Sequence, residues 1–371
     1  MYCKRIEVEN FRNIEKAEID FSDGVNILVG ENAQGKTNLL EAIFFSSVGR
    51  SFRTPHSNEL IRFGESYGDV LLTYRDSSRE NKIHLKIMKD KQKLVEKNGL
   101  KMDKLSDIVG SFRSVLFCPE HLSLIKEGPH ERRGYMDVAI SRLYPMYIHS
   151  LQRYAYFLKQ RNALIKNAIK DRATFDATVE LWTEKLADEA STIASMRYKY
   201  VKRAEKHIVE CFSEMTGDRE RPTVIYDGSS GQIEEEYLDK EKTRKKYFEL
   251  LMTSHEREIL AGTTLFGIHK DDIDIRLNGN RARNYASQGQ QRSLALAMKL
   301  AEGEICCEEY GDHPVFLFDD VLSELDEGRR DYLLNRIEGK QVIMTTCEID
   351  SMEKISGAKK IEVKSGSYKE I

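Results

Sequence analysis

The sequence of 371 residues lacks the features that mark membrane and secreted proteins. No apolar run approaches the roughly 20 residues that a membrane-spanning helix needs, and Met1–Glu7 contains no apolar core of a signal peptide. The six cysteines form no C-x-x-C pair and no metal-like spacing. These absences argue against a transmembrane or disulfide-stabilised protein. They predict reduced thiols in a cytoplasmic protein that has no membrane partner.

An excess of charge of one sign is also absent. Lys and Arg number 58 and Asp and Glu number 61, so the formal net charge is −3. Any binding of nucleic acid would therefore have to come from local patches rather than from the global charge. A chain of this length is long for one hydrophobic core, and we expect two domains.

One stretch of the chain carries the strongest chemical signal. The apolar residues 25–29 predict a buried strand, and residues 38–48 predict a helix. Between them stands the pattern G-x-x-x-x-G-K-T, from Gly30 to Thr37. Its glycines let the backbone bend around a phosphate chain, with successive N–H groups turned inward at a helix N-terminus. The alternative is a strand-to-helix turn that matches by chance.

This pattern predicts a site for ATP and Mg²⁺. Lys36 can reach the β- and γ-phosphates, and the Thr37 hydroxyl can ligate Mg²⁺. The predicted cofactor-binding loop consists of Gly30, Glu31, Asn32, Ala33, Gln34, Gly35, Lys36 and Thr37.

A second half of the site is expected far downstream. Four apolar residues, Val315–Phe318, are followed by Asp319 and Asp320, which is a Walker B pattern. A buried strand would deliver Asp319 to the P-loop, where it can hold Mg²⁺ together with Thr37. Asp320 can then orient or deprotonate the attacking water.

The segment Ser287-Gln288-Gly289-Gln290 resembles the signature loop of the ABC ATPase superfamily, which usually reads Leu-Ser-Gly-Gly-Gln. A serine and an exposed glycine backbone at a helix N-terminus form a second anion site. Because the P-loop already holds the phosphates, this second site is expected to act on the γ-phosphate bound to another subunit. Ser323–Asp326 resembles the D-loop of the same interface. Ser287 therefore joins Lys36, Asp319 and Asp320 as a predicted catalytic residue.

The resemblance extends to a narrower family. Asn10–Ile14 and Asn26–Asn32 look like the opening of SMC-like head proteins that act on DNA. Further segments resemble bacterial RecF, and they span nearly the whole chain. They are Gly49–Arg53, Phe117–Glu120, Gly128-Pro129 with Glu131-Arg132-Arg133, Arg161–Leu164, Gly262–Gly267, Ser287–Leu296 and Asp319–Asp326.

The resemblance implies an ATP-dependent DNA-binding protein of recombinational DNA repair and replication restart. It implies a homodimer, head to head, with ATP at the interface, and RecO and RecR as partners in loading RecA at gapped DNA and supporting the SOS response. It gives Gly30–Thr37 the P-loop role and Ser287–Gln290 the signature role in trans. Asp319 takes the Mg²⁺ role, and Arg12 joins the cofactor-binding residues.

Departures from ABC transporters refine this expectation. Asp320 replaces a glutamate, and its shorter reach predicts slow hydrolysis, a weak DNA-stimulated ATPase that acts as a switch. Phe117–Glu120 lies where a Q-loop glutamine is usual, and Thr345-Thr346 lies where a switch histidine is usual. Lys270 stands where the RecF family usually has arginine, so the bidentate fork of arginine is lost there.

The order of patterns along the chain is sheet, helical insert, sheet. It predicts an α/β fold, an ABC/SMC-type P-loop ATPase head with a mixed sheet, formed by residues 1–125 and 260–371. Residues 126–259 would form an inserted, mainly helical lid or arm domain. Within it, residues 179–215 could be a single long helix, joined to the preceding helix near residues 171–176 in an antiparallel hairpin.

Lysines outnumber carboxylates in the hairpin between Lys82 and Lys104. This region predicts either a DNA-contacting face or simply a solvated strand face. The candidate DNA-binding residues are Arg50, Arg53, Lys86 and Lys93.

Two other functions remain open. One is a nucleotide-binding subunit of an ABC-type transporter, which would ignore DNA. The other is a structural scaffold with a degenerate site, which the intact Lys36, Thr37 and Asp319 argue against.

Overall fold

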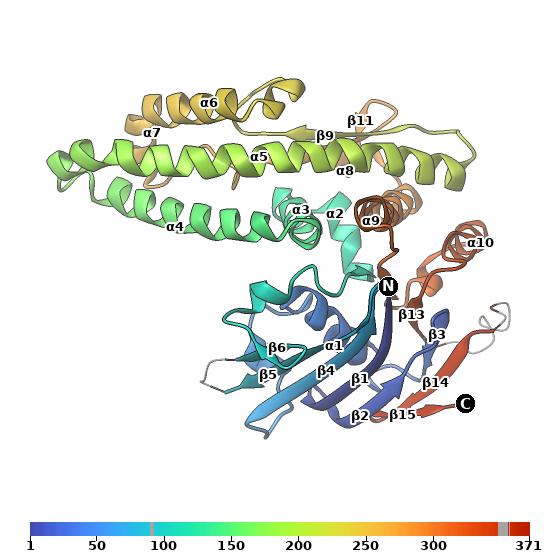
Figure 1. Cartoon of the computed structure of the whole chain (residues 1–371). Helices are drawn as coiled ribbons and strands as arrows, with labels where there is room; N and C mark the ends of the chain where they lie inside the picture. The colour runs from blue at the N-terminus through green and yellow to red at the C-terminus, as the bar shows by residue number, and fades with distance from the viewer. Residues whose placement is uncertain (90–92, 348–354, 356) are drawn as a thin grey trace. The chain divides into compact units, whose positions relative to one another are not determined.

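The structure, a computed structural model, describes residues 1–89, 93–347, 355 and 357–371. The chain divides into two compact units (Figure 1). Unit 1 consists of residues 1–122, 214–217 and 292–371, and unit 2 of residues 123–213 and 218–291. Residues 260–291, which the sequence analysis assigned to the ATPase domain, therefore group with the helical insert. The reason is strand pairing, because β10 (Asp272–Leu277) pairs with β9 (Pro222–Asp227) of the insert.

Unit 1 contains a six-stranded antiparallel sheet in the order β2-β1-β4-β5-β6-β7. Its strands are β1 (Tyr2–Phe11), β2 (Ile14–Asp20), β4 (Tyr67–Arg75), β5 (Glu80–Met88), β6 (Leu94–Lys97) and β7 (Leu100–Lys101). Alternate residues of β5, such as Ile83 and Leu85, are buried, as period-2 patterning predicts. The predicted Asn98-Gly99 turn joins β6 to β7, and both residues have positive φ, 53° and 76°.

A second six-stranded sheet of unit 1 has the order β15-β14-β3-β13-β12-β8. Its strands are β3 (Val25–Val29), β8 (Ser114–Phe117), β12 (Val315–Phe318), β13 (Val342–Thr346), β14 (Lys359–Lys364) and β15 (Ser367–Glu370). The pairings are parallel except for that of β15 with β14. β3, β8, β12 and β13 read as continuous apolar runs because such strands are covered on both faces. The predicted α/β fold with a mixed sheet is confirmed.

Helix α1 (Lys36–Val48) begins directly at the P-loop and contacts strands of both sheets. It is buried on nearly every side, so it lies in the core of unit 1. α9 (Gln288–Tyr310) crosses from unit 2 into unit 1 at residue 292, and α10 (Glu327–Arg336) follows the Walker B region. The short 3₁₀ segments of unit 1 are η1 (Ser57–Leu60), η2 (Leu105–Ile108), η3 (Pro119–Leu122) and η5 (Leu322–Glu324).

Unit 2 is mainly helical. Its remaining elements are α2 (Ser123–Lys126), α3 (Pro129–Leu143), α4 (Pro145–Asn167), α5 (Arg172–Thr216), η4 (Glu234–Leu238), α6 (Lys240–Thr253), α7 (His255–Ala261), β11 (Asn280–Arg281) and α8 (Ala282–Tyr285). The predicted long helix is present as α5, which has 45 residues and is about 68 Å long at 1.5 Å per residue. α4 and α5 lie side by side in a hairpin (Figure 1).

Fully buried ion pairs hold the helices of unit 2 together. Arg161 and Glu258 are both 0% exposed, and their closest atoms are 2.7 Å apart. Arg161 also donates to the Thr264 hydroxyl (2.9 Å), and that hydroxyl donates to the Asn162 side-chain oxygen (2.7 Å). Two of the segments that resemble RecF therefore meet each other here, in the interior of unit 2.

A second buried pair lies at the segment that contains Lys270. The guanidinium of Arg197 donates to the carboxylate of Asp137 (2.9 Å) and to the carbonyl of Ile268 (2.6 Å), and it lies 3.5 Å from Asp271. Burial raises the pKa of the Asp271 carboxyl. These contacts anchor the segment by its backbone and by Asp271, whereas the Lys270 side chain is exposed.

Candidate nucleotide site

A cavity of about 450 Å³ lies within unit 1 at the carboxyl ends of β3, β8, β12 and β13. Parallel strands end at the same edge of a sheet, so four segments that are remote in sequence meet there. The lining residues are Asn13, Asn32, Ala33, Gln34, Gly35, Lys36, Thr37, Asn38, Arg53, Pro119, Glu120, Asp319, Asp320, Thr345 and Cys347. The predicted P-loop and the predicted Walker B aspartates are thus brought together.

Both glycines of the P-loop pattern are required by its geometry. Gly35 has φ of 116° and caps the N-terminus of α1, a conformation that L-residues with a side chain rarely adopt. At Gly30 an added Cβ would collide with the backbone carbonyl of Val363 in β14. The loop follows β3 and opens α1, which is the context that a phosphate-binding loop needs.

Lys36 and Thr37, which were predicted to bind phosphate and Mg²⁺, both line the cavity. The buried Lys36 ammonium donates to the carbonyls of Gly30 and Glu31, the latter at 2.8 Å. The Thr37 hydroxyl donates to the Asp319 carboxylate at 2.8 Å, across 282 residues of sequence. A hydroxyl next to a carboxylate provides hard oxygen ligands, which fit Mg²⁺.

Thr345 connects the two aspartates. Its hydroxyl donates to the Asp319 carboxylate (2.8 Å) and accepts from the backbone N–H of Asp320 (2.9 Å). Burial raises the pKa of the Asp319 carboxyl, and the hydroxyls of Thr37 and Thr345 partly offset this rise. Thr345 lies here because β13 runs between β3 and β12, an order that the Walker motifs alone do not reveal.

The rim of the cavity contains a chain of side-chain hydrogen bonds. The Asn38 amide donates to the Asn13 side-chain oxygen (2.7 Å), and Arg53 donates to the Asn38 side-chain oxygen (2.9 Å). Sequence reasoning missed Asn13 and Asn38, although Asn38 directly follows the P-loop. It assigned Arg53 to DNA, whereas the structure brings this guanidinium to the nucleotide cavity.

Arg12, predicted to bind the cofactor, does not line the cavity. Its guanidinium donates two hydrogen bonds, of 2.9 and 2.8 Å, to the carboxylate of Glu41, which is fully buried in α1. The Ser51 hydroxyl donates to the same carboxylate at 2.5 Å. Arg12 therefore neutralises a core glutamate, and that glutamate anchors the loop that carries Arg53.

Two further side chains reach the cavity without having been predicted as site residues. Glu120 follows β8 and lies where the Q-loop glutamine of ABC proteins was sought, so the position holds a carboxylate. The Cys347 thiol lies 3.4 Å from the Lys36 ammonium. The signal that could have found Glu120 is its place directly after a strand that pairs with β12.

A family model described as "RecF/RecN/SMC N terminal domain" matches residues 2–369. The DNA replication and repair protein RecF of Bacillus cereus (strain G9842) is 35% identical over 370 residues, which are 99% of this chain and 98% of that relative. RecF of Bacillus thuringiensis (strain Al Hakam) is also 35% identical over the same shares. The chain belongs to the RecF family.

Solved structures agree with the RecF assignment. The chain matches "the recombination mediator protein RecF-ATPrS in RecFOR pathway" with a TM-score of 0.93 and 36% identity, over 100% of this chain and 98% of that one. The RecF-ATP structure of the same pathway matches with a TM-score of 0.91 over 100% and 99%. An Smc head domain from Pyrococcus furiosus, 18% identical with a TM-score of 0.56 over 100% and 96%, shares the fold. The chain thus has the fold of an SMC-type ATPase head.

RecF membership leaves the transporter-subunit alternative without support. Within the described residues, no helix is long and apolar enough to cross a membrane.

The residues of the signature-like loop of this RecF-family chain lie in unit 2 and, among the described residues, do not line the cavity of unit 1. The backbone N–H of Ser287 donates to the Gln290 side-chain oxygen (2.5 Å), and the backbone N–H of Gln290 donates to the Ser287 hydroxyl (3.3 Å). This reciprocal capping box opens α9. Ser287 and Gln288 are exposed, and Gly289 is half-buried.

The candidate DNA-binding lysines are engaged within the first sheet. Lys86 lies 3.7 Å from the Asp69 carboxylate, and its ammonium lies 4.2 Å from the centre of the Tyr67 ring. Lys93 donates to the Ser57 hydroxyl, and burial lowers the pKa of its ammonium. Arg50 is exposed in the loop after α1.

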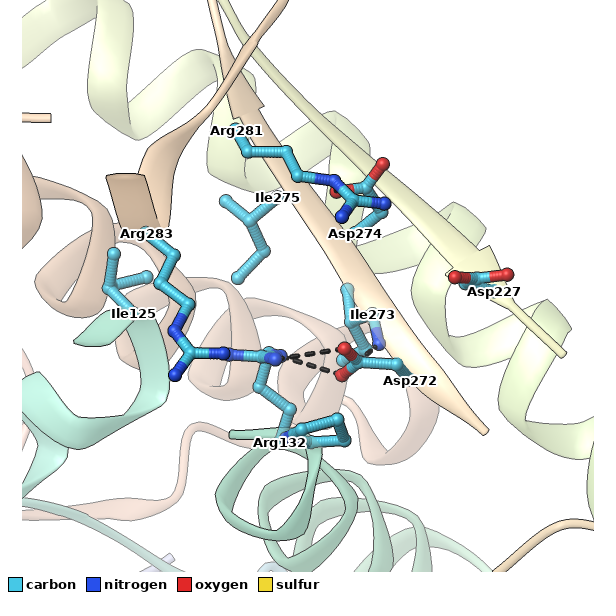
Figure 2. Close-up of a pocket in the computed structure, with 10 residues that line it drawn as sticks. Ile125, Arg132, Asp227, Asp272, Ile273, Asp274, Ile275, Arg281 and Arg283 are labelled. Carbon is cyan, nitrogen blue, oxygen red and sulfur yellow. Dashed lines mark hydrogen bonds and ion pairs between the residues drawn. The ribbon is translucent and has the colours of Figure 1, made fainter. Parts of the chain in front are cut away.

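A second cavity, of about 250 Å³, lies within unit 2 (Figure 2). Its most buried cation, Arg132, makes two hydrogen bonds to Asp272, of 2.7 and 2.8 Å, which the dashed lines in Figure 2 mark. Asp274 pairs with Arg281 at 3.4 Å. Because these charges of the wall pair with one another, we assign no ligand to this cavity.

Proposed function

We propose that this RecF-family protein binds ATP with Mg²⁺ in the cavity of unit 1 and hydrolyses it slowly, as a switch for a head-to-head homodimer on DNA. The observation that carries the proposal is the hydrogen-bonded contact of Thr37, Asp319 and Thr345 beside the P-loop. In the cell, it would act with RecO and RecR to load RecA at gapped DNA, in replication restart and the SOS response.

Different residues of the cavity have different roles toward ATP. The N–H groups of the P-loop and the Lys36 ammonium bind the phosphates. Thr37 and Asp319 hold Mg²⁺, which supplies charge compensation for the phosphate oxygens. Asp320 orients the attacking water, and its backbone is held by Thr345. An aspartate reaches one methylene less far than a glutamate, which supports slow turnover.

The dimer part of the proposal rests on the exposed N-terminus of α9. Ser287→Arg would place a bulky cation where the trans γ-phosphate contact is expected. Binding of ATP to the monomer should stay intact, and ATP-driven dimerisation should be lost in sedimentation velocity. Ser77→Arg, on an exposed turn of unit 1, is the matched control. Normal ATP-dependent dimers of Ser287→Arg would reject the sandwich.

The DNA part is tested by fluorescence anisotropy of labelled duplex DNA, with ATP and with ADP, at two salt concentrations. Binding that requires ATP and weakens steeply with salt is the expected result, because released counterions make phosphate contacts salt-dependent. Equal binding in both nucleotides, or none, would remove the DNA role and leave the ATPase standing.

The surface proposed for DNA is the lysine-rich face of β5 and its hairpin. Lys86→Glu and Lys93→Glu should weaken DNA binding at low salt. Lys93 is partly buried, so Lys82→Glu, at an exposed position of β5, is the variant that leaves the fold undisturbed. Unchanged DNA affinity in Lys82→Glu and Lys86→Glu would exclude this face.

A further inference from the structure

The C-terminal strands β14 and β15 form a hairpin beside the P-loop, which the sequence analysis did not predict. β14 pairs in parallel with β3, the strand that leads into the P-loop, with Ile361 opposite Leu28. Figure 1 shows β14 next to β3. The hairpin turns at Ser365 and Gly366, whose φ values are 50° and 78°. The turn is thereby brought to the outer side of the P-loop.

Hydrogen bonds join this hairpin to two consecutive P-loop residues, Gln34 and Gly35. The backbone N–H of Ser365 donates to the Gln34 side-chain oxygen (2.6 Å), and the backbone N–H of Gly366 donates to the Gln34 carbonyl (2.8 Å). The Tyr368 hydroxyl donates to the Gly35 carbonyl (2.9 Å). The hairpin therefore holds the carbonyl side of the loop at Gln34 and Gly35.

The turn between β1 and β2 also approaches this part of the P-loop. A Cβ at Gly35 would lie 2.9 Å from the Asn13 side-chain oxygen and 3.2 Å from the Tyr368 hydroxyl. A Cβ at Gly366 would lie 2.8 Å from the Asn13 carbonyl. Gly35 is thus enclosed between Asn13 and Tyr368, with no room for a side chain.

The enclosed backbone adopts an unfavourable conformation. Ala33 has φ of 64° and Gly35 has φ of 116°. A non-glycine residue in the left-handed region costs of order 1 kcal/mol and persists where its surroundings over-determine it. The hairpin holds Gln34 and Gly35, the two residues that follow Ala33.

We propose that Tyr368 and the Ser365-Gly366 turn are positioning residues of the nucleotide site. By holding the carbonyl of Gln34, and that of Gly35 together with the Leu39 N–H of α1, the hairpin keeps the N–H groups of the loop directed at the phosphates. ATP binding and docking of the hairpin then stabilise each other, because such a coupling is reciprocal. The inference rests on the proposed function, that the P-loop of this chain binds ATP.

The first test is Tyr368→Phe, which removes one hydroxyl and keeps the ring. We expect ATP to bind roughly 3- to 10-fold more weakly, the range that corresponds to one hydrogen bond. The melting temperature without nucleotide should stay close to that of the unchanged chain. Tyr156→Phe, at an exposed tyrosine of α4, is the matched control and should bind ATP normally.

The second test measures the coupling in the unchanged chain by hydrogen exchange. Saturating Mg²⁺–ATP should slow exchange of the Ser365 and Gly366 amides, both of which donate to Gln34. The effect should be smaller in Tyr368→Phe. A merely structural role of the hairpin would leave these amides insensitive to ATP.

Lys36→Ala distinguishes a failure of the proposed ATP binding from a failure of the positioning role of the hairpin. If the unchanged chain binds no ATP, or if Lys36→Ala binds it equally well, the proposed function fails. If ATP binding depends on Lys36 but Tyr368→Phe binds ATP like the unchanged chain and the hairpin amides do not respond, the positioning role is overturned.

Discussion

The nucleotide cavity of unit 1 and the buried ion pairs of unit 2 both contain buried cationic and carboxylate side chains, but these side chains have different partners in the two regions. In the buried ion pairs of unit 2 the charges are matched inside the protein, as that of Arg161 is by Glu258. In unit 1, within the part of the chain that the structure describes, Lys36 has carbonyl and thiol partners but no carboxylate, and Asp319 has two hydroxyls but no cation. The first arrangement is complete by itself, whereas the second suits a ligand that carries both phosphate and a metal ion.

This difference shows that residues of a family motif can serve either the packing of the fold or the chemistry of a site. Segments resembling RecF occur in both regions, and charged residues are prominent in both. Only the geometry shows that Arg161 and Asn162 stabilise the packing of helices, whereas Lys36 and Asp319 face a cavity. A charged residue in a motif is therefore a candidate for chemistry only when its charge is left unmatched in the fold.

The largest expected effect lies in unit 2. Arg161→Ala leaves the Glu258 carboxylate buried and without its cation, which should lower the free energy of unfolding by about 3–5 kcal/mol. Equilibrium unfolding in urea measures this loss. The double variant Arg161→Met with Glu258→Leu removes both charges and should be much less destabilised. Equal destabilisation of the single and double variants would contradict the assignment of a matched pair.

Lys36→Ala should weaken ATP binding strongly and change the stability of the fold little, in contrast to Arg161→Ala. It removes a charged donor to the phosphates, so ATP should bind roughly 100-fold more weakly. Calorimetric titration with Mg²⁺–ATP measures the affinity. The free energy of unfolding without nucleotide should change far less than in Arg161→Ala. A large loss of stability with little loss of affinity would place Lys36 with the structural charges.

Thr345→Val tests the link between the two aspartates. The hydroxyl offsets the raised pKa of the Asp319 carboxyl and fixes the backbone of Asp320. Its loss should slow ATP hydrolysis roughly 10-fold, about the value of one to two hydrogen bonds, with a smaller change in ATP affinity. Thr345→Ser keeps the hydroxyl and should hydrolyse ATP near the normal rate. A normal rate in Thr345→Val would remove Thr345 from the site.

A third charge cluster, which is half-buried, is expected to give the smallest effect. On the first sheet, the His84 ring lies between the carboxylates of Asp69 (2.9 Å) and Glu96 (3.2 Å). The hydrogen bond with Asp69, foremost, raises the pKa of the imidazole, and Glu96 adds to the rise. A raised pKa in the folded state stabilises the protein below the ordinary value of about 6.5, and the gain disappears as the pH rises through the folded-state pKa.

His84→Gln should therefore lower the free energy of unfolding at pH 5.5 by at most about 1 kcal/mol, the scale of a partly exposed pair. The difference from the unchanged chain should shrink at pH 8.5. Urea unfolding at the two pH values measures it. A deficit that is equal at both pH values, or larger at pH 8.5, would show that the charge of His84 is not the cause.

Local patterns predicted much of the fold. Residues 25–29 form the predicted strand, and the long helix is present, because apolar runs and helical periodicity are properties of neighbouring residues. β9 and β14 were missed. β14 is short and rich in lysine, and it becomes a strand by pairing with β3, more than 300 residues away in the sequence. Such pairing leaves no local signal.

The residues of the candidate site were likewise predicted where a local motif marks them and missed where the tertiary structure brings them in. The P-loop and Asp319 were predicted because their spacing encodes phosphate and metal chemistry directly. Arg53 reaches the cavity through a loop anchored on α1, which no motif encodes. Thr345 was noted only as standing where a switch histidine is usual, and its contact with both aspartates depends on the order of strands in the sheet. The pairing of Arg12 with Glu41, the one carboxylate of α1, was not predicted, because the two residues lie 29 positions apart in the sequence.

The hairpin of β14 and β15 has a consequence for synthesis of the protein. The P-loop precedes Ser365 and Tyr368, with which it makes hydrogen bonds, by more than 300 positions, so a ribosome makes the loop long before these partners. A nascent chain that ends before β14 contains every residue of the Walker motifs but lacks the hairpin that holds Gln34 and Gly35 of the P-loop. Competence to hold nucleotide is thus expected to arise only after β14 and β15 have been made and their hairpin has paired beside the P-loop.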